Sequence, residues 1–77
     1  MNVGSRVVGI GSAYGIIIEN QYGVIVARDE DDVGILLVDF DEKFDSRLHN
    51  GNGAIDGIVT NNGWFCREDN LRLKGGE

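Results

Sequence analysis

The residues of this 77-residue chain whose side chains could do chemistry are few. It has one histidine, His49, and one cysteine, Cys66, and the carboxylates of Asp45 and Asp56 stand near the histidine in the sequence. A histidine that reaches a thiol can act as a general base for a nucleophile. However, Cys66 ends the aromatic run "WFC", and in such a strand-like segment a cysteine usually serves as a small apolar residue. We therefore expect no catalytic residues and predict that the chain is not an enzyme.

Other motifs bear some likeness to known ligand sites. The run "GIGSAYG" (9–15) has glycines like those of a phosphate loop, but its spacing is G-x-G-x-x-x-G and no lysine follows. The run "DEDDVG" (29–34) begins like a calcium loop, but valine holds the fifth position and phenylalanine the twelfth. Asp39 and Asp41 share one face of a predicted strand, an arrangement more typical of a strand end entering solvent. The sequence therefore predicts no metal and no cofactor.

The charge of the chain limits its partners. Thirteen acidic and seven basic residues give a formal charge of −6. Binding to nucleic acid draws its affinity from Lys and Arg, so direct nucleic-acid binding is not expected. An acidic surface is suited to a basic partner, such as a nucleic-acid-binding protein, although the charge could equally serve only solubility. There is no charged-then-apolar leader and no long apolar span, so we expect a cytoplasmic protein without membrane contact.

The length of the chain predicts a single domain, 1–77. A domain of this size buries only about 60% of the surface that its unfolded chain exposes, so its stability is limited. An internal disulfide is impossible with one cysteine, and a free thiol fits a reducing compartment. A homo-oligomer remains a possible source of additional buried area.

The apolar residues come in short bursts that are rich in Val and Ile and bounded by Gly, Asn or Asp, which predicts β-strands. No window has a sustained helical period, so the fold class is predicted to be all-β. Closure into a partly open barrel would hide the edges of so many short strands. The predicted strand segments are 6–10, 15–19, 22–29, 33–40, 63–67 and 71–74.

The segment "YGVIVARDEDDVGILLVDFDE" (22–42) is the clearest local unit. Its two apolar runs flank the acidic tract 29–32, which is typical of an antiparallel hairpin with a turn built on Asp side chains. Both faces of this hairpin are partly apolar, so we expect its outer face to meet another sheet or subunit. Gly23 and Gly34 are the expected positions of a bend or bulge.

The order of "GSRVVGI", this hairpin, a Gly-rich loop with "LHNGNG", and "GWFCREDNLRL" resembles small SH3-like β-barrel proteins, many of them encoded by bacteriophages and their bacterial hosts. The likeness covers residues 4–73. It implies one SH3-like barrel of five to six short antiparallel strands with a long Gly/Asn-rich loop at about 41–62. The segment "IGSAYGIIIENQ" (10–21) departs from the scheme and is predicted to form an added strand or a long recognition loop.

The loop 41–62 and the aromatic residues are the predicted recognition elements. Loops longer than about 12–15 residues are usually functional or disordered, and Asn and Gly can present amide and backbone N–H groups to a ligand. We expect this loop to be ordered on the barrel mouth, with a loop that merely closes the barrel as the alternative. Tyr and Trp are favoured anchors of interfaces. The predicted partner-binding residues are Tyr14, Tyr22, Phe44, Arg47, His49, Asn50, Asn52 and Trp64, with the alternative that Phe40, Trp64 and Phe65 are core residues.

Three functions follow as hypotheses. The first is a phage-encoded binding module that engages a host protein through its loops and one barrel face, as an inhibitor or counter-defence factor. The second is an oligomer that sequesters a nucleotide-like ligand, and the third is a structural subunit of a virion. The acidic charge argues against the second unless several arginines converge, namely Arg6, Arg28, Arg47, Arg67 and Arg72.

Overall fold

The computed structural model describes residues 1–42 and 57–74, and within them the protein is all-β with antiparallel strand pairs. Each predicted segment contains a strand: 63–67 has the predicted bounds, 15–19 is reduced to Ile16–Ile17, and the other four are one or two residues shorter than predicted. Within the described ranges, no helix has the length and apolar character that crossing a membrane requires. The elements are β1 (Arg6–Gly9), β2 (Ser12–Ala13), β3 (Ile16–Ile17), β4 (Tyr22–Arg28), β5 (Ile35–Phe40), β6 (Gly63–Arg67), the 3-10 helix η1 (Glu68–Asn70) and β7 (Leu71–Leu73).

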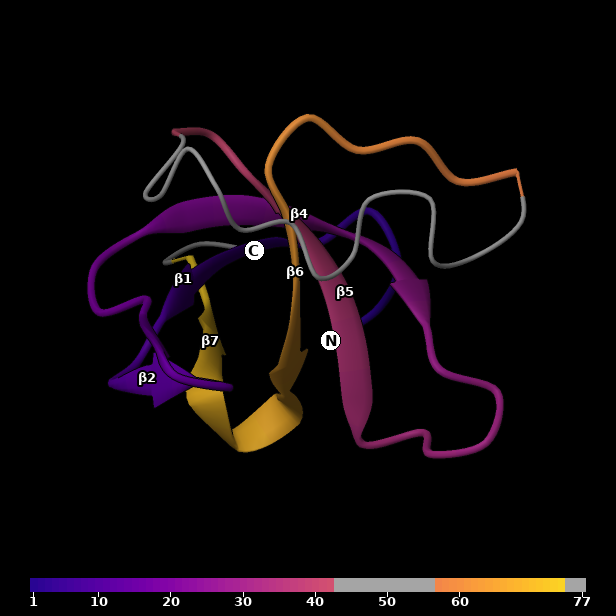
Figure 1. Cartoon of the computed structure of the whole chain (residues 1–77), viewed down its shortest axis with the longest axis horizontal. Coiled ribbons are helices and arrows are strands. Elements are labelled where there is room, and N and C mark those ends of the chain that lie inside the picture. The colour runs from indigo at the N-terminus through magenta and orange to yellow at the C-terminus, as the bar shows by residue number, and fades with distance from the viewer. Residues whose placement is uncertain (43–56, 75–77) are drawn as a thin grey trace.

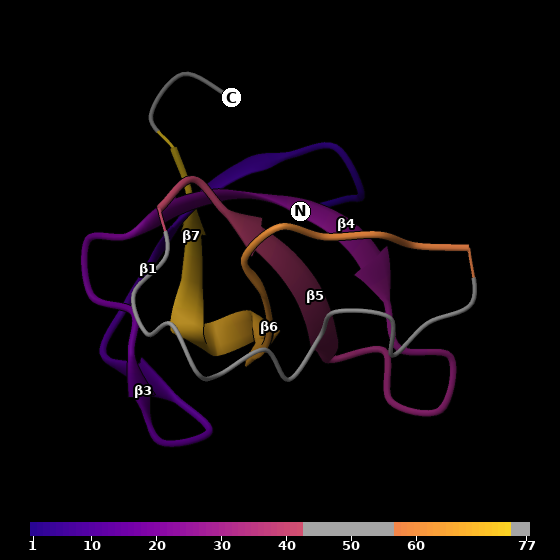
Figure 2. The same ribbon diagram turned by 45° about the horizontal axis from the view of Figure 1, so that its top comes forward.

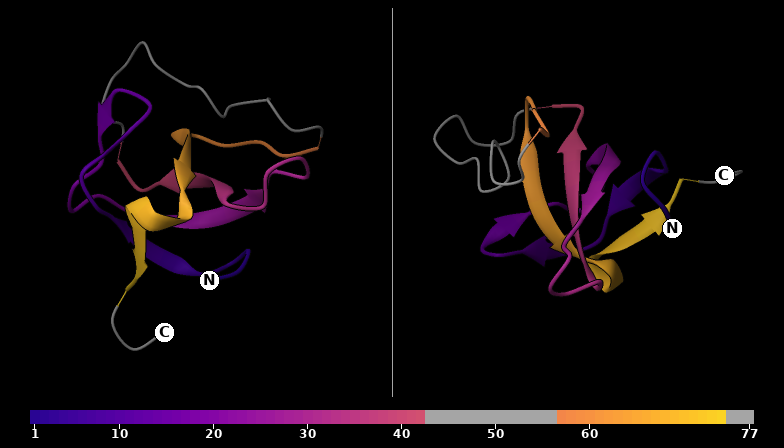
Figure 3. Two further views of the ribbon diagram at one scale, coloured as in Figure 1. Left: turned by 90° about the horizontal axis from the view of Figure 1, so that it is seen from below. Right: turned by 90° about the vertical axis from the view of Figure 1, so that its right-hand side faces the viewer.

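Five of the strands form one sheet in the order β6-β5-β4-β1-β7. The sheet is strongly curved, and η1 lies at the corner where the chain turns from β6 into β7 (Figures 1 and 3). The expected closure into a barrel is not reached through strand pairing, because no ladder between described residues joins β6 to β7. Instead, β2 packs against β6.

The segment 10–21 forms an added hairpin, β2–β3, which resolves the choice between a strand and a long loop (Figure 2). Ala13 pairs with Ile16, so the turn consists of Tyr14 and Gly15 alone, with φ of 47° and 85°. Two successive positive φ angles are typical of the two-residue turns that match strand twist in hairpins. The indole Nε1–H of Trp64 donates to the Ala13 carbonyl at 2.7 Å, which ties the hairpin to β6.

The other end of the hairpin rests directly on β1 at Gly9. The Gly9 N–H donates to the Gln21 carbonyl at 2.8 Å, and the Asn20 N–H donates to the Gly9 carbonyl at 3.1 Å. A Cβ at Gly9 would lie 2.9 Å from both the carbonyl carbon and the Cβ of Ile18. Only glycine therefore allows this approach of the hairpin to the sheet.

One face of the sheet and the hairpin enclose the hydrophobic core. Along β5, Leu36, Val38 and Phe40 alternate onto this face, and Trp64 and Cys66 do so along β6. Apolar side chains from six strands and the segment after β3 therefore share one cluster. Its buried members are Val7, Ala13, Ile18, Ile25, Leu36, Val38, Phe40, Trp64, Cys66 and Leu71.

The β-bulge in the β4–β5 hairpin does not lie at Gly23 or Gly34, where the sequence predicted a bend or bulge. The register shifts between Ile25 and Ala27, so Val26 is the extra residue of a β-bulge. Gly23 instead permits close strand packing, since a Cβ there would lie 2.7 Å from Cγ1 of Val38. Gly34 belongs to the turn rather than to a bulge.

The acidic tract forms the expected turn between β4 and β5. Oδ1 of Asp29 accepts from the backbone N–H of Asp31 at 2.8 Å and of Asp32 at 3.4 Å. Oδ1 of Asp32 accepts from the Gly34 N–H at 3.1 Å. These side-chain bonds satisfy backbone donors that the strand ladder does not reach, which is why Asp is favoured in such turns. We refer to residues 29–34 as the acidic turn.

Candidate functional site

A hollow of about 220 Å³ is lined by Tyr14, Asp29, Ile35 and Phe65. We call it the Tyr14 hollow. These residues come from the tip of the β2–β3 hairpin, the start of the acidic turn, and strands β5 and β6. Leu37 pairs directly with Phe65, and side chains alternate along a strand, so Ile35 and Phe65 lie on the same face of the sheet. Segments distant in the sequence thus combine an apolar floor with a carboxylate.

Tyr14 is the most unusual residue of this hollow. Its side chain is large, yet the residue is 55% exposed, and its φ of 47° is in the left-handed region. That region is unfavourable for L-residues other than Gly, Asn and Asp, by about 1–2 kcal/mol. Backbone strain of this kind is concentrated at functional sites. An exposed aromatic ring held at a strained position is therefore a strong candidate for a contact residue.

The acidic turn gives the hollow its charge. Asp29 is half-buried, and Oδ1 of its carboxylate is already occupied by backbone amides of the turn. The following residues Glu30, Asp31 and Asp32 are exposed. The Asp29 carboxylate next to an aromatic and aliphatic floor, with three more carboxylates following it in the turn, favours a ligand group that is both cationic and partly apolar, because the charge and the rings attract it together.

Tyr22 does not share the hollow with Tyr14. It is 42% exposed, and Nζ of Lys74 lies 5.6 Å from the centre of its ring. Nearby, the guanidinium of Arg6 donates to both oxygens of Asp41, at 2.8 and 2.7 Å, and this hydrogen bonding holds the pKa of Asp41 below its usual range. A second, polar hollow of about 210 Å³ is found here. It is lined by Asn20, Gln21, Tyr22, Asp41 and Glu42.

Of the two places expected for Trp64, a binding surface and the core, the structure has it in the core. It is only 4% exposed, and its indole N–H is bonded to Ala13 within the core. An indole in this position contributes a large buried area and satisfies its one donor internally. Trp64 therefore supports the hairpin that carries Tyr14 and does not itself line the hollow.

Phe44, Arg47, His49, Asn50 and Asn52 lie outside the described residues.

The described end of the long loop is anchored to β5 through one residue. The backbone N–H of Asn62 donates to Oδ1 of Asp39 at 2.9 Å, and its side-chain amide donates to the Phe40 carbonyl at 3.0 Å. This is the kind of contact expected of the amide side chains in this tract. Val59, by contrast, is 86% exposed.

The thiol of Cys66 is buried, and burial raises its pKa from 9.0 to about 12. A thiol with this pKa is almost wholly protonated at neutral pH, and the thiolate is the reactive form. The position of Cys66 in the core therefore does not favour a role as nucleophile. In residues 1–42 and 57–74, no three His, Cys, Asp or Glu side chains are grouped in a way that could hold a metal ion.

Two of the arginines that a nucleotide-like ligand would need, Arg6 and Arg28, are already engaged by acidic side chains. Arg6 begins β1 and is bonded to Asp41, whereas Arg28 ends β4 and pairs with Glu68. Their charges are thus used in two separate ion pairs. Arg47 falls outside the described part of the chain.

Sequence reasoning identified Tyr14 but missed Asp29, Ile35 and Phe65 as its neighbours. Asp29 was interpreted only as a turn residue, and Phe65 only as part of a core strand. The available signal was the apolar character of both faces of the 22–42 hairpin, which leaves Ile35 on the side opposite the core; the side of Phe65 follows only from its pairing with Leu37.

No protein-family model matches the chain, and comparison with curated proteins and with solved structures yields no match. The class that the described fold defines is a small all-β protein with antiparallel sheets.

Proposed function

We propose that this protein is a non-enzymatic binding module of the SH3-like class that engages another protein through the Tyr14 hollow. The observation that carries the proposal is the position of Tyr14, an exposed aromatic residue in a strained two-residue turn, on the same hollow as the carboxylate of Asp29. A purely structural turn would place Asn or Gly at this position, since these residues adopt positive φ readily. Retaining tyrosine there is best explained by a contact that its ring makes.

The SH3-like assignment is supported by the order of the elements. The strands that the resemblance implies, at 6–9, 22–28, 35–40, 63–67 and 71–73, build one strongly curved sheet, and the additional segment 10–21 is inserted as a hairpin between the first two. Inserting a hairpin there gives the sheet a recognition element without altering its core strands. The same resemblance supports a phage-encoded protein that acts on a host protein.

A basic partner is the best match to the charges. The chain carries a net charge of −6, and the acidic turn has four carboxylates, the first of which, that of Asp29, lines the hollow. Complementary charge would steer a basic protein to this surface and favour a lysine or arginine side chain in the hollow. A nucleic-acid-binding protein whose basic site becomes occupied is such a partner, so the module would act as an inhibitor or counter-defence factor.

The two alternatives, an oligomer that sequesters a nucleotide-like ligand and a virion subunit, have no comparable observation behind them. The separate ion pairs of Arg6 and Arg28 do not favour a phosphate site. A homo-oligomer would be compatible with protein binding, and light scattering measures it directly.

Photo-crosslinking tests the proposal. A photoreactive phenylalanine analogue replaces Tyr14 in one protein and Val59, which is more exposed, in a matched control. Each protein is irradiated in a bacterial lysate, and the captured protein is identified and purified. The proposal predicts a stoichiometric, basic partner captured from position 14 and not from position 59, with an affinity that falls at least tenfold for Asp29→Asn. Equal capture from both positions, or unchanged affinity for Asp29→Asn, would contradict it.

A further inference from the structure

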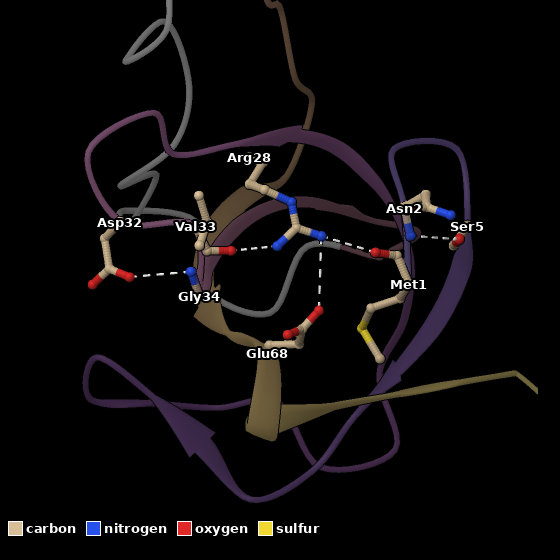
Figure 4. A network of polar contacts seen from close by, with 8 residues as sticks. All are labelled: Met1, Asn2, Ser5, Arg28, Asp32, Val33, Gly34 and Glu68. Carbon is tan, nitrogen blue, oxygen red and sulfur yellow. Dashed lines mark hydrogen bonds and ion pairs between the residues drawn. The ribbon is translucent and has the colours of Figure 1, made fainter.

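Arg28 joins segments that are distant in the sequence (Figure 4). Its Nη1 donates to the carbonyl oxygen of Val33 in the acidic turn. Its Nη2 donates to the carbonyl oxygen of Met1 at 2.8 Å and lies 3.7 Å from Oε1 of Glu68 in η1. One guanidinium therefore connects the first residues of the chain, the acidic turn and the corner between β6 and β7.

The first residues of the chain are themselves fixed to the sheet. The Gly4 N–H donates to the Ile25 carbonyl at 2.7 Å, and the Ile25 N–H donates to the Ser5 carbonyl at 3.1 Å. The Asn2 N–H donates to Oγ of Ser5 at 3.1 Å, and the Met1 side chain packs on the core. The Met1 carbonyl is thus an acceptor that other contacts hold in place, and Arg28 connects it to the acidic turn.

Bonds within the acidic turn hold its two ends together. The Asp29 N–H donates to the Ile35 carbonyl at 2.9 Å, and the Ile35 N–H donates to the Asp32 carbonyl at 3.0 Å. They close the turn on itself, whereas the bond from Arg28 to Val33 orients the turn relative to the rest of the sheet. Asp29, the first residue of the turn, and Ile35, which directly follows it as the first residue of β5, both line the Tyr14 hollow.

A guanidinium is suited to this position, and an ammonium is not. Its planar fork presents several N–H donors in fixed directions, so two carbonyls and a carboxylate can be reached together. The side chain is 31% exposed, which leaves these charge-assisted bonds partly shielded from water. Its positive charge also offsets the repulsion among the four carboxylates that follow it in the sequence.

We propose that Arg28 is the positioning residue of the Tyr14 hollow: by bridging Met1, Val33 and Glu68 it sets the orientation of the acidic turn and so the places of Asp29 and Ile35. This inference rests on the proposed function for its meaning, because the hollow is the surface that Arg28 positions. Its consequence is that recognition depends on a residue that does not line the hollow.

The test compares three variants of the full chain. Arg28→Lys keeps the charge and loses the fork. Glu68→Gln removes only the longer ion pair. Arg6→Lys makes the same exchange at the Asp41 pair, on the other polar hollow, and is the matched control. Amide hydrogen exchange of Asp29 and Ile35 is measured by NMR and corrected for the global stability of each variant.

The second readout is binding of a defined probe. The probe is an acetylated, amidated octapeptide with a single arginine among alanine and leucine residues, and its partner peptide carries norleucine in place of the arginine. Affinities come from chemical-shift titration of the Asp29, Ile35 and Phe65 amides, which reports binding at the hollow rather than general attraction to an acidic protein.

For Arg28→Lys we expect roughly tenfold faster exchange of both amides and a roughly tenfold weaker affinity for the arginine probe, the effect of losing one charge-assisted hydrogen bond. Arg6→Lys and Glu68→Gln should remain within about twofold of wild type, because they leave both carbonyl bonds of Arg28 intact. Unchanged exchange in Arg28→Lys, or equal acceleration in Arg6→Lys, would overturn the inference whatever the probe does. If exchange accelerates while the wild type binds neither peptide, Arg28 does position the turn and the proposed preference for a basic partner is wrong.

Discussion

Two substitutions in the turn of the β2–β3 hairpin, Tyr14→Asn and Tyr14→Ala, should differ in stability but weaken binding alike. Replacing Tyr14 by Asn or by Ala removes the same ring from a residue that is 55% exposed, so both variants lose a similar amount of buried area. They differ at the backbone, because φ is 47° and asparagine tolerates the left-handed region whereas alanine does not. The free energy of unfolding of Tyr14→Asn should therefore exceed that of Tyr14→Ala by about 1 kcal/mol.

Urea denaturation and thermal melting measure this difference. For a domain of this size, 1 kcal/mol corresponds to a difference of about 4–8 °C in Tm. Both variants should bind the partner captured from position 14 at least tenfold more weakly than wild type, while Tyr14→Phe keeps the ring and should retain binding. Equal stability of the Asn and Ala variants would show that the turn is not strained. Full binding by Tyr14→Asn would show that the ring is not a contact.

Four further predictions concern Cys66, the Arg6–Asp41 pair and Gly9. Burial raises the pKa of the Cys66 thiol from 9.0 to about 12, so the unfolded chain ionises first as the pH rises, and between these two values stability should fall by about 1.4 kcal/mol per pH unit. Urea denaturation at pH 8, 9 and 10 should show a correspondingly smaller slope for Cys66→Ala. The thiol should also react with a disulfide reagent only upon unfolding, and rapid reaction of the native protein would contradict its burial. The Arg6–Asp41 pair is surface-exposed, so Asp41→Asn should cost only about 0.2–1 kcal/mol of stability at neutral pH. Because the folded pKa of Asp41 is lowered, this stabilisation is present above its unfolded pKa and is lost as the pH falls through the folded value, which acid titrations of the wild type and of Asp41→Asn would show. Gly9→Ala should destabilise the fold by about 1–3 kcal/mol through overpacking against the end of the hairpin, and a calorimetric Tm equal to that of wild type would refute the close approach.

The sequence predicted the strands because their signals are local. Bursts such as 22–28 and 35–40 are rich in β-branched residues and are separated by an Asp-rich turn, and each of these preferences acts within a few residues. The place of Cys66 in the core also followed from its immediate neighbours. Asp29 was correctly expected to form a turn, since its hydrogen bonds extend only two and three residues along the chain.

The composition of the hollow could not be predicted in the same way. Tyr14 and Phe65 are separated by fifty residues and come to line one hollow only because the hairpin folds back onto β6. That contact includes the bond between the Trp64 indole and the Ala13 carbonyl, whose residues are 51 positions apart, so no local signal in the sequence indicates it. The bulge at Val26 likewise depends on how β4 and β5 pair, which the positions of the glycines do not determine.

The position of the bound partner is the most direct test of the proposed binding surface. Hydrogen exchange of the full chain, measured with and without the captured partner, reports which backbone segments the partner protects. The proposal predicts protection of 12–17 and 29–35, the segments that carry Tyr14, Asp29 and Ile35. Protection confined to 20–22 and 41–42, around the second hollow, would contradict it.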